Sequence, residues 1–352
     1  MARSVRPSRL VALALGAAVL TACGTATLAP RVTKRAAGAT AQALVKSDSP
    51  IDAKRALAHV DRLTDAEMQG RMTATTGEEK ANAYIQAEFE KLGLPVIRQT
   101  FRSKVFQGDA QNIIALMPGS ERAGRVVIVG AHKDHLGIRS GKTYHGANDN
   151  AGGVAGVLEI ARAIVDRNVN HGDRPRANIL FMAFSGEELG LIGSTHYTKN
   201  PIIPTMDGGS RPIDLKDVVG MVNLDCIAVG NTNTIGTDAV EDAFGTRDAL
   251  SSLAAGRGMT PVFKPFRIPH AHAHPGEALP PWASSDHASF RKAGVRSICY
   301  YAEPVMSKYL HSPNDTIPSR DEIKKAPIDQ FNADNLARIA TVGYDTVRTW
   351  AQ

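Results

Sequence analysis

The sequence lacks long apolar runs, strong net charge, internal repeats and an abundance of cysteine. The apolar run at residues 10–20 is too short to span a bilayer comfortably. The formal net charge is only +6 and the basic residues are not clustered, so the charge pattern indicates a solvated surface and no nucleic-acid partner. With 22% charged and 43% apolar residues, the composition is that of a globular protein, neither disordered nor fibrous.

The first residues form a separate segment. Arg3, Arg6 and Arg9 precede the apolar run at 10–20, which is the order of a secretory signal. The run ends in Leu-Thr-Ala-Cys-Gly at 20–24, which resembles the lipobox of bacterial lipoproteins, cut before the cysteine. An ordinary secretory signal with a chance cysteine is the alternative. We predict a signal peptide at 1–22, a lipidated tether at 23–47 and a domain at 48–352, lipid-anchored to a membrane of the cell envelope through Cys23.

Removal of this leader takes away three arginines and no acids, which leaves 38 basic and 35 acidic residues and a net charge of +3. The two remaining cysteines, Cys226 and Cys299, both lie in apolar, strand-like runs. An oxidising compartment would permit a disulfide between them. Two buried free thiols are equally consistent with the sequence.

Strand-like and helix-like segments alternate along the predicted domain. A helical pattern begins near Ile51, and residues 77–94 carry apolar residues at an amphipathic spacing. Such alternation predicts a sheet that helices cover on both faces. Strands are expected at 96–101, 112–117, 125–132, 178–184, 218–225 and 297–302, and further helices at 152–165 and from residue 187 onward.

Acidic residues and histidines occur where several of these strands end. "AHKDHLG" places His132 and Asp134 two residues apart, so an extended backbone would aim both to one side. Asp225 ends the run "MVNLD", and two adjacent acids, Glu187 and Glu188, follow the strand at 178–184. In open α/β sheets, sites lie beyond the carboxyl ends of strands.

Two further candidates lie in loops. Asp149 occurs in "GANDNAGG", where alone it would be read as a helix N-cap, and His311 occurs in "HSPNDT". Nitrogen and oxygen donors without thiolates suit zinc in an open catalytic site. Three carboxylates and two imidazoles are too many for one tetrahedral ion and fit two ions that share a bridging carboxylate. The candidate ligands are His132, Asp149, Glu188, Asp225 and His311.

The order and local sequence of these motifs resemble the zinc aminopeptidases of peptidase family M28, through most of residues 55–345. "AHKDHLG", "GANDNAGG", "FSGEELGLIGS", "NLD" and "HSPNDT" occur in the family's order, and "LTDAEMQGRMTATTGEEKANAYI" is similar to its N-terminal helical region. The resemblance implies a three-layer α/β/α sandwich with a central mixed, mostly parallel sheet of the zinc-peptidase type. It also implies an aminopeptidase that removes N-terminal residues from peptide substrates.

The resemblance further implies a role for each candidate. His132 and Asp225 would hold one zinc ion, Glu188 and His311 the other, and Asp149 would bridge both. Asp134 would orient His132 through its other ring nitrogen. Glu187 would be the general base, taking a proton from the metal-bridging water and returning it to the leaving amine.

One position departs from the family pattern. Several members have a tyrosine directly before the last ligand histidine, where this sequence has Leu310. Tyr309, Tyr300 or Tyr301 could replace it as the group that steadies the oxyanion, or zinc could act alone. "SSDHASF", with Asp286 and His287, resembles a family motif near the substrate pocket and is read as structural support or a substrate contact.

Two other functions stay open at this point. Glutaminyl cyclases are acyltransferases that resemble M28 peptidases in fold and work with a single zinc. A non-catalytic, peptide-binding lipoprotein on a peptidase scaffold is the third possibility. The complete set of ligands and the presence of Glu187 favour a hydrolase with two zinc ions per chain.

Overall fold

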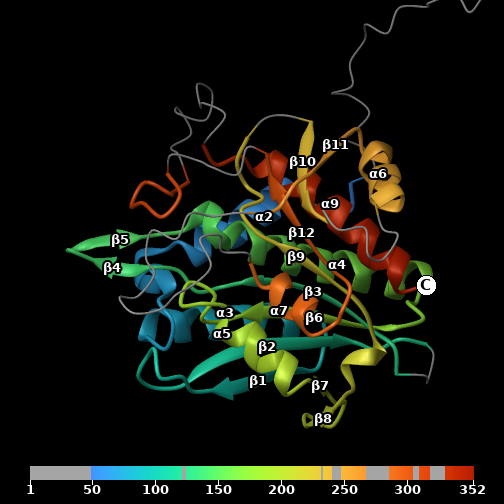
Figure 1. Cartoon of the computed structure of the whole chain (residues 1–352), viewed down its shortest axis with the longest axis horizontal. Helices are drawn as coiled ribbons and strands as arrows, with labels where there is room; N and C mark the ends of the chain where they lie inside the picture. Colours follow the sequence, from blue (N-terminus) through green and yellow to red (C-terminus); the bar gives the residue numbers. More distant parts are fainter. Residues whose placement is uncertain are drawn as a thin grey trace, which may run out of the picture. The chain divides into compact units, whose positions relative to one another are not determined.

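An eight-stranded sheet runs through the residues that the structure, a computed structural model, describes (Figure 1). These residues are 49–120, 124–230, 233–239, 247–266, 285–303, 309–317 and 330–352, and they belong to one compact unit, Ala41–Gln352. In spatial order the strands are β1 (Val96–Phe101), β2 (Ala110–Met117), β6 (Asn178–Phe184), β3 (Val126–His132), β9 (Val218–Leu224), β12 (Ser297–Ala302), β10 (Thr234–Asp238) and β11 (Thr260–Phe263).

The middle of the sheet is parallel. β6, β3, β9 and β12 run in one direction, whereas β1 and β2 are antiparallel additions at one edge and β10 pairs antiparallel with β12. In the register of the parallel strands, His132 lies opposite Phe184, and Gly130 lies opposite Asn223. The carboxyl ends of β6, β3 and β9 therefore meet at one edge of the sheet.

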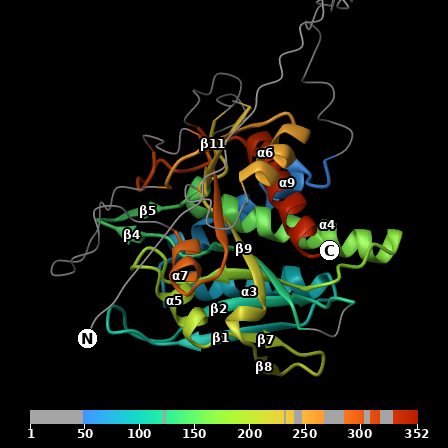
Figure 2. The same cartoon turned by 45° about the vertical axis from the view of Figure 1, so that its right-hand side comes forward.

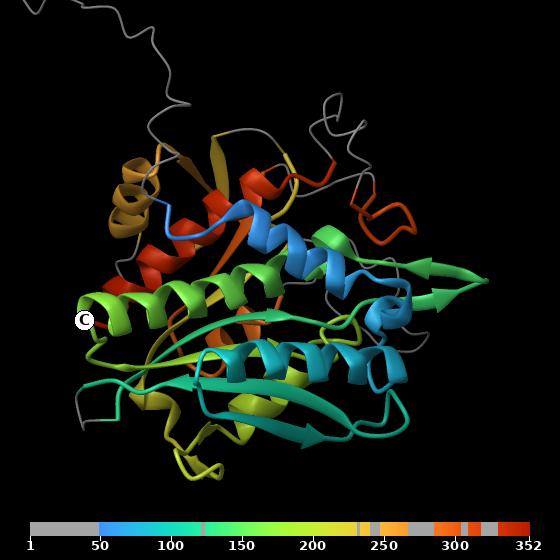
Figure 3. The same ribbon diagram turned by 180° about the vertical axis from the view of Figure 1, so that it is seen from behind.

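Helices cover both faces, because alternate side chains of each strand point to opposite sides. Val127 and Val129 of β3 belong to a large core shared with α2, α3, α4 and α9, which lie together in front of the sheet in Figure 3. Val126 and Ile128 belong to a smaller core on the other face, where α5 and α7 lie (Figure 2). The predicted three-layer α/β/α sandwich with a mixed, mostly parallel sheet is thus confirmed. The helices are α2 (Ala53–Leu63), α3 (Thr76–Lys91), α4 (Gly152–His171), α5 (Ile192–Lys199), α6 (Arg247–Gly256), α7 (His287–Lys292) and α9 (Ala333–Trp350).

Short elements complete the described fold. Several of them surround the carboxyl edge of the sheet, and the sequence pattern had not indicated them. They are the helical turns η1 (Ala66–Arg71), η2 (Ala147–Ala151) and η3 (Leu215–Asp217), and the two hairpins β4 (Gly137–Arg139) with β5 (Lys142–Tyr144) and β7 (Ile202–Pro204) with β8 (Ser210–Pro212).

The helix expected to begin at Glu187 begins five residues later, and that prediction is wrong. Glu187 and Glu188 lie in a turn, and α5 starts at Ile192. The backbone at Gly186, Gly190 and Leu191 has positive φ angles of 71°, 105° and 58°. These left-handed conformations interrupt a right-handed helix. The two glutamates are therefore held by a turn that directs them separately.

The structure also bears on the cysteines and the leader. Cys226 and Cys299 are free thiols, and both are buried. In the part of the chain that the structure describes, we find no helix both long and apolar enough to cross a membrane. The predicted signal peptide, Cys23 and the tether up to residue 47 lie outside the described residues.

Candidate metal centre

The five predicted ligands come together at the carboxyl edge of the sheet. His132 is the last residue of β3, and Asp225 directly follows β9. Glu188 lies in the turn after β6, Asp149 lies in η2 ahead of α4, and His311 lies in a loop after β12. Three of these segments leave neighbouring parallel strands, so the order of strands in the sheet brings their side chains into one place.

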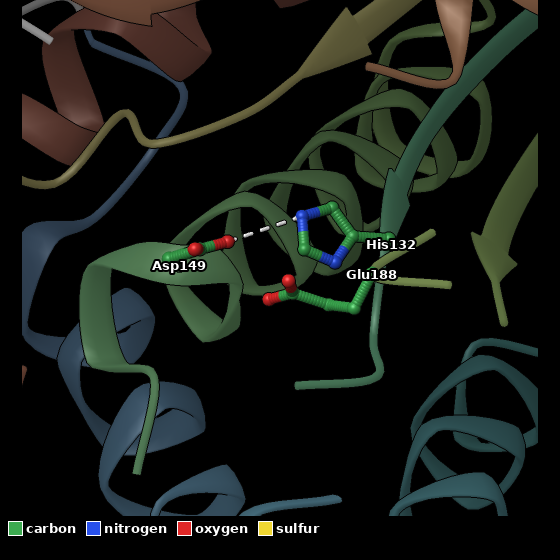
Figure 4. Close-up of side chains that lie close together, drawn as sticks. All are labelled: His132, Asp149 and Glu188. Atoms are coloured by element: carbon green, nitrogen blue, oxygen red, sulfur yellow. Dashed lines mark ion pairs between the residues drawn. The ribbon is translucent and has the colours of Figure 1, made fainter. Parts of the chain in front are cut away.

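Asp149 lies between two histidines. Its Oδ1 is 3.2 Å from Nε2 of His132, and its Oδ2 is 3.0 Å from Nε2 of His311. Figure 4 shows the Asp149 carboxylate directed at the His132 ring, with Glu188 reaching into the same space. Asp149 is not the N-cap of α4, because Asn150 accepts the hydrogen bond from the Gly153 amide instead. Each carboxylate oxygen of Asp149 thus serves a different imidazole.

The remaining ligands divide between these two histidines. Oδ1 of Asp225 lies 3.5 Å from Nε2 of His132, and Oε2 of Glu188 lies 3.4 Å from Nε2 of His311. The donor atoms of His132, Asp149 and Glu188 lie within 4.8 Å of one another, and so do those of His132, Glu187 and Asp225. The two close pairs follow the division that the family resemblance implies, whereas the clusters also bring Glu188 and Glu187 near His132.

The polar atoms at the centre fit bound cations. Oδ2 of Asp149 and both oxygens of Asp225 are buried, and the groups that face them are imidazoles: His311 lies 3.0 Å from Oδ2 of Asp149, and His132 lies 3.5 Å from Oδ1 of Asp225. Buried carboxylates are costly unless they are paired or coordinate a metal. Burial raises the pKa of the nearby Cys226 thiol well above the usual range. The five predicted ligands offer imidazole and carboxylate donors, and this set suits zinc.

Electrostatics point to an excess of negative charge. Burial lowers the pKa of His132, but the carboxylates of Glu187 and Asp225 outweigh burial and raise that pKa well above its usual value. Burial raises the pKa of Glu187 well above its usual range, and the carboxylates of Asp225 and Glu188 add to this effect, although His132 opposes it. A site with this charge favours cations.

Asp134 makes a different contact from the one expected. Nδ1 of His132 lies 3.1 Å from the backbone oxygen of Asp134, whereas the nearest carboxylate oxygen is 3.9 Å away. The backbone carbonyl therefore orients the imidazole. The carboxylate accepts hydrogen bonds from the backbone N–H groups of Glu187, at 3.2 Å, and Glu188, at 3.4 Å, and from the Thr73 hydroxyl, at 2.9 Å. Asp134 thus holds the turn that carries the two glutamates, and burial raises its pKa to about 6.

Two residues near the ligands had no role in the sequence interpretation. Nδ1 of His135 lies 2.7 Å from Oε1 of Glu188, so this histidine orients a predicted ligand. The second histidine of "HKDH" was the signal available for it. Asp315 accepts hydrogen bonds from the backbone N–H groups of Asn148, at 2.9 Å, and Asp149, at 3.0 Å, which joins the His311 loop to the Asp149 loop.

The residues of the "SSDH" motif and two of the tyrosines have defined contacts in the structure. His287 lies 3.1 Å from Asp238, which is a supporting contact, while the Asp286 carboxyl is fully buried and burial raises its pKa to about 7. The Tyr300 hydroxyl shares a hydrogen bond with Thr346, and the Tyr301 hydroxyl donates to the Lys264 carbonyl. Of the three tyrosines considered as oxyanion donors, Tyr300 and Tyr301 therefore have hydroxyls that are engaged elsewhere.

The chain is similar in sequence and in fold to known aminopeptidases. A probable leucine aminopeptidase of Arthroderma otae is 31% identical over 217 residues, which are 60% of this chain and 53% of that protein. The chain spans about half the length of the curated relatives it matches. A zinc aminopeptidase from Bacillus subtilis superposes with a TM-score of 0.63 at 17% identity, over 85% of this chain and 96% of its own.

A glutaminyl cyclase from Porphyromonas gingivalis superposes almost as well. Its TM-score is 0.61 at 17% identity, over 85% of this chain and 98% of its own, so the fold is common to both kinds of enzyme. The sequence model of peptidase family M28 matches residues 112–336, which include all five predicted ligands and both adjacent glutamates. This match covers well over half of the chain, and the chain therefore belongs to peptidase family M28.

Proposed function

We propose that this chain is a metallo-aminopeptidase that uses two zinc ions to hydrolyse N-terminal residues from peptides. The observation that carries the proposal is the position of Asp149, whose two oxygens face His132 and His311 separately. A carboxylate shared in this way is the central feature of two-metal hydrolases, whose ions lie roughly 3.5–4 Å apart. Relatives named leucine aminopeptidases support the choice of substrate.

Each residue has a distinct task in this proposal. His132 and Asp225 would hold one ion, Glu188 and His311 the other, and Asp149 both. Zinc bound there would supply a Lewis acid and an activated water. Glu187 would accept a proton from the attacking water and return it to the leaving amine. Asp134 would hold Glu187 in position, because its carboxylate accepts a hydrogen bond of 3.2 Å from the Glu187 backbone N–H.

A glutaminyl cyclase is the second candidate, and the fold likeness to such an enzyme supports it. The contacts of Asp149 with both His132 and His311, with Asp225 beside His132 and Glu188 beside His311, favour two ions over the single zinc expected of a cyclase. A non-catalytic peptide-binding protein is a third reading. The burial of Asp149 and Asp225 close together counts against it, because buried carboxylates are costly to a scaffold that binds no metal.

Zinc content and substrate turnover, measured on one preparation, separate these functions. Two zinc ions per chain together with hydrolysis of aminoacyl-p-nitroanilides would support the aminopeptidase. One ion at saturation with cyclisation of N-terminal glutamine would favour the cyclase, and peptide binding without turnover would favour the third reading. Peptides labelled at either end distinguish an aminopeptidase from a carboxypeptidase or dipeptidase.

We also propose that the protein acts outside the cytoplasm, anchored to a membrane of the cell envelope by a lipid on Cys23. The lipobox-like sequence at 20–24 supports this placement. A tether of 25 residues, 23–47, would let the domain reach peptides near the membrane surface.

A further inference from the structure

Two buried charged side chains lie in a segment upstream of the family match, which begins at residue 112. Arg71 is 0% exposed and Glu78 is 1% exposed. Charged side chains are almost never fully buried unless they are paired. Both belong to residues 71–78, which connect η1 to the first turn of α3. The partners of these two side chains lead to the candidate metal centre.

Glu78 joins the ends of two strands. Lys133, between His132 and Asp134, is fully buried, and its Nζ lies 2.5 Å from Oε1 of Glu78. The Ser185 hydroxyl, which directly follows β6, donates to the same oxygen. Oε2 accepts from the backbone N–H of Ala74 at 2.6 Å. One carboxylate therefore ties the exit of β3 to the exit of β6.

Arg71 extends this connection to the Asp149 loop. Its guanidinium donates to the backbone oxygen of Lys133 at 2.9 Å, and to those of His145 at 2.7 Å and Gly146 at 2.9 Å. A further bond of 2.7 Å reaches the Leu63 carbonyl at the end of α2. The segment thus binds three stretches of chain that carry predicted ligands, namely those with His132, Glu188 and Asp149.

We propose that residues 71–78 form a brace for the metal centre, and that Glu78 is the positioning residue through which it acts. The inference rests on the proposed metal site. Ligands on separate loops must be held to within about 0.5 Å of their working geometry, and rigid supporting contacts provide this. Partners behind a metal's ligands typically change affinity or activity 10–100-fold when they are removed. Glu78 touches no predicted ligand itself, so its effect must pass through Lys133 and Ser185.

Glu78→Gln tests the brace, with Glu159→Gln as a matched control. Glu159 is also 1% exposed, pairs with Arg55 and accepts a backbone N–H, from Asp52, but it lies two turns inside α4. We expect Glu78→Gln to weaken zinc binding about 10–100-fold in competition with a chelator, and to lower kcat at saturating zinc with KM little changed. Glu159→Gln should lower the melting temperature of the zinc-free protein yet leave zinc affinity as in the wild type.

The following results would overturn the proposal. If Glu78→Gln bound zinc as tightly as the wild type, or if Glu78→Gln and Glu159→Gln lost affinity equally, the brace would be refuted but the metal site would not. A wild-type protein that binds no zinc would instead remove the metal site and the brace together. If Glu78→Gln does not fold, Ser185→Ala is the test variant, because it removes the hydroxyl that donates to Glu78 and should weaken zinc affinity about 10-fold.

The control for Ser185→Ala is Ser297→Ala, whose buried hydroxyl donates to the His287 carbonyl. Unchanged zinc affinity in both serine variants would refute the brace.

Discussion

Asp149 presents its oxygen Oδ2 to His311 at 3.0 Å while its other oxygen faces His132 at 3.2 Å. The two histidines come from opposite ends of the matched region, one from the end of β3 and the other from a loop after β12. Because this carboxylate is shared, its removal should affect both proposed zinc ions, whereas removal of either imidazole should affect one.

Removal of the shared carboxylate should disturb two ions at once. We expect Asp149→Ala to lose both zinc ions at chelator concentrations that strip neither from the wild type, because its carboxylate contacts both imidazoles. His132→Ala and His311→Ala should each lose one ion, and a different one. Elemental analysis after chelator titration gives the stoichiometry, and Asp149→Ala with one tightly held ion would contradict the bridging role.

Glu187 and Glu188 should respond differently to the same substitution. Glu188→Gln removes a charged oxygen ligand, so zinc content and activity should both fall. Glu187→Gln keeps the size and hydrogen bonding of the side chain but cannot accept a proton, so zinc should stay while kcat falls. General acid–base catalysis contributes roughly 10²–10⁴-fold, and we expect a loss near the top of that range because one residue makes both transfers. KM should change less than kcat.

Zinc analysis of these two variants could also contradict the roles assigned to Glu187 and Glu188. If Glu187→Gln loses zinc and Glu188→Gln retains it, the two roles are exchanged. This outcome is physically open, because Glu187 also lies within 4.8 Å of donor atoms of His132 and Asp225. Zinc analysis and initial rates on both purified variants provide the measurement.

Glu159 should contribute stability that depends on pH. Burial alone would raise the pKa of Glu159, but the His59 imidazole at 3.8 Å and the Arg55 and Arg162 guanidinium groups at 3.2 Å outweigh it and lower the pKa from 4.5 to about 2. A carboxyl whose pKa is depressed in the folded state stabilises the fold above its unfolded pKa, and this stability is lost as the pH falls from about 4.5 to 2. The effect is on the order of 2–3 kcal/mol. Denaturant unfolding of wild type and Glu159→Gln should show that gap at pH 7, and a gap independent of pH would refute the ionic contribution.

The lipid anchor makes a prediction about Cys23. Labelled fatty acid should enter the wild-type protein, and Cys23→Ala should either release the protein from membranes or block its maturation. The motif at 20–24 requires the cysteine at its cleavage point, so serine at this position should not replace it. Wild-type protein without label, in cells that label other lipoproteins, would refute the anchor.

The strand ends could be predicted from the sequence because buried parallel strands are nearly continuous apolar runs. The runs before His132 and Asp225 end within one residue of the observed strands, and this places both residues at the carboxyl edge of the sheet. The turn after β6 could not be predicted, since Leu191 takes a left-handed conformation that its residue type does not favour. Contacts of His135 with Glu188 and of Lys133 with Glu78 join residues 53 and 55 positions apart, and no local pattern reveals such pairs.

The position of His311 has a consequence for when the proposed enzyme becomes active. Its imidazole reaches the shared carboxylate from 162 positions further along the chain, after the last strand that enters the middle of the sheet. A polypeptide still emerging from the ribosome would have His132, Asp149 and Glu188 long before it had their final partner. Hydrolytic activity would therefore arise only after nearly the whole domain had been synthesised and folded.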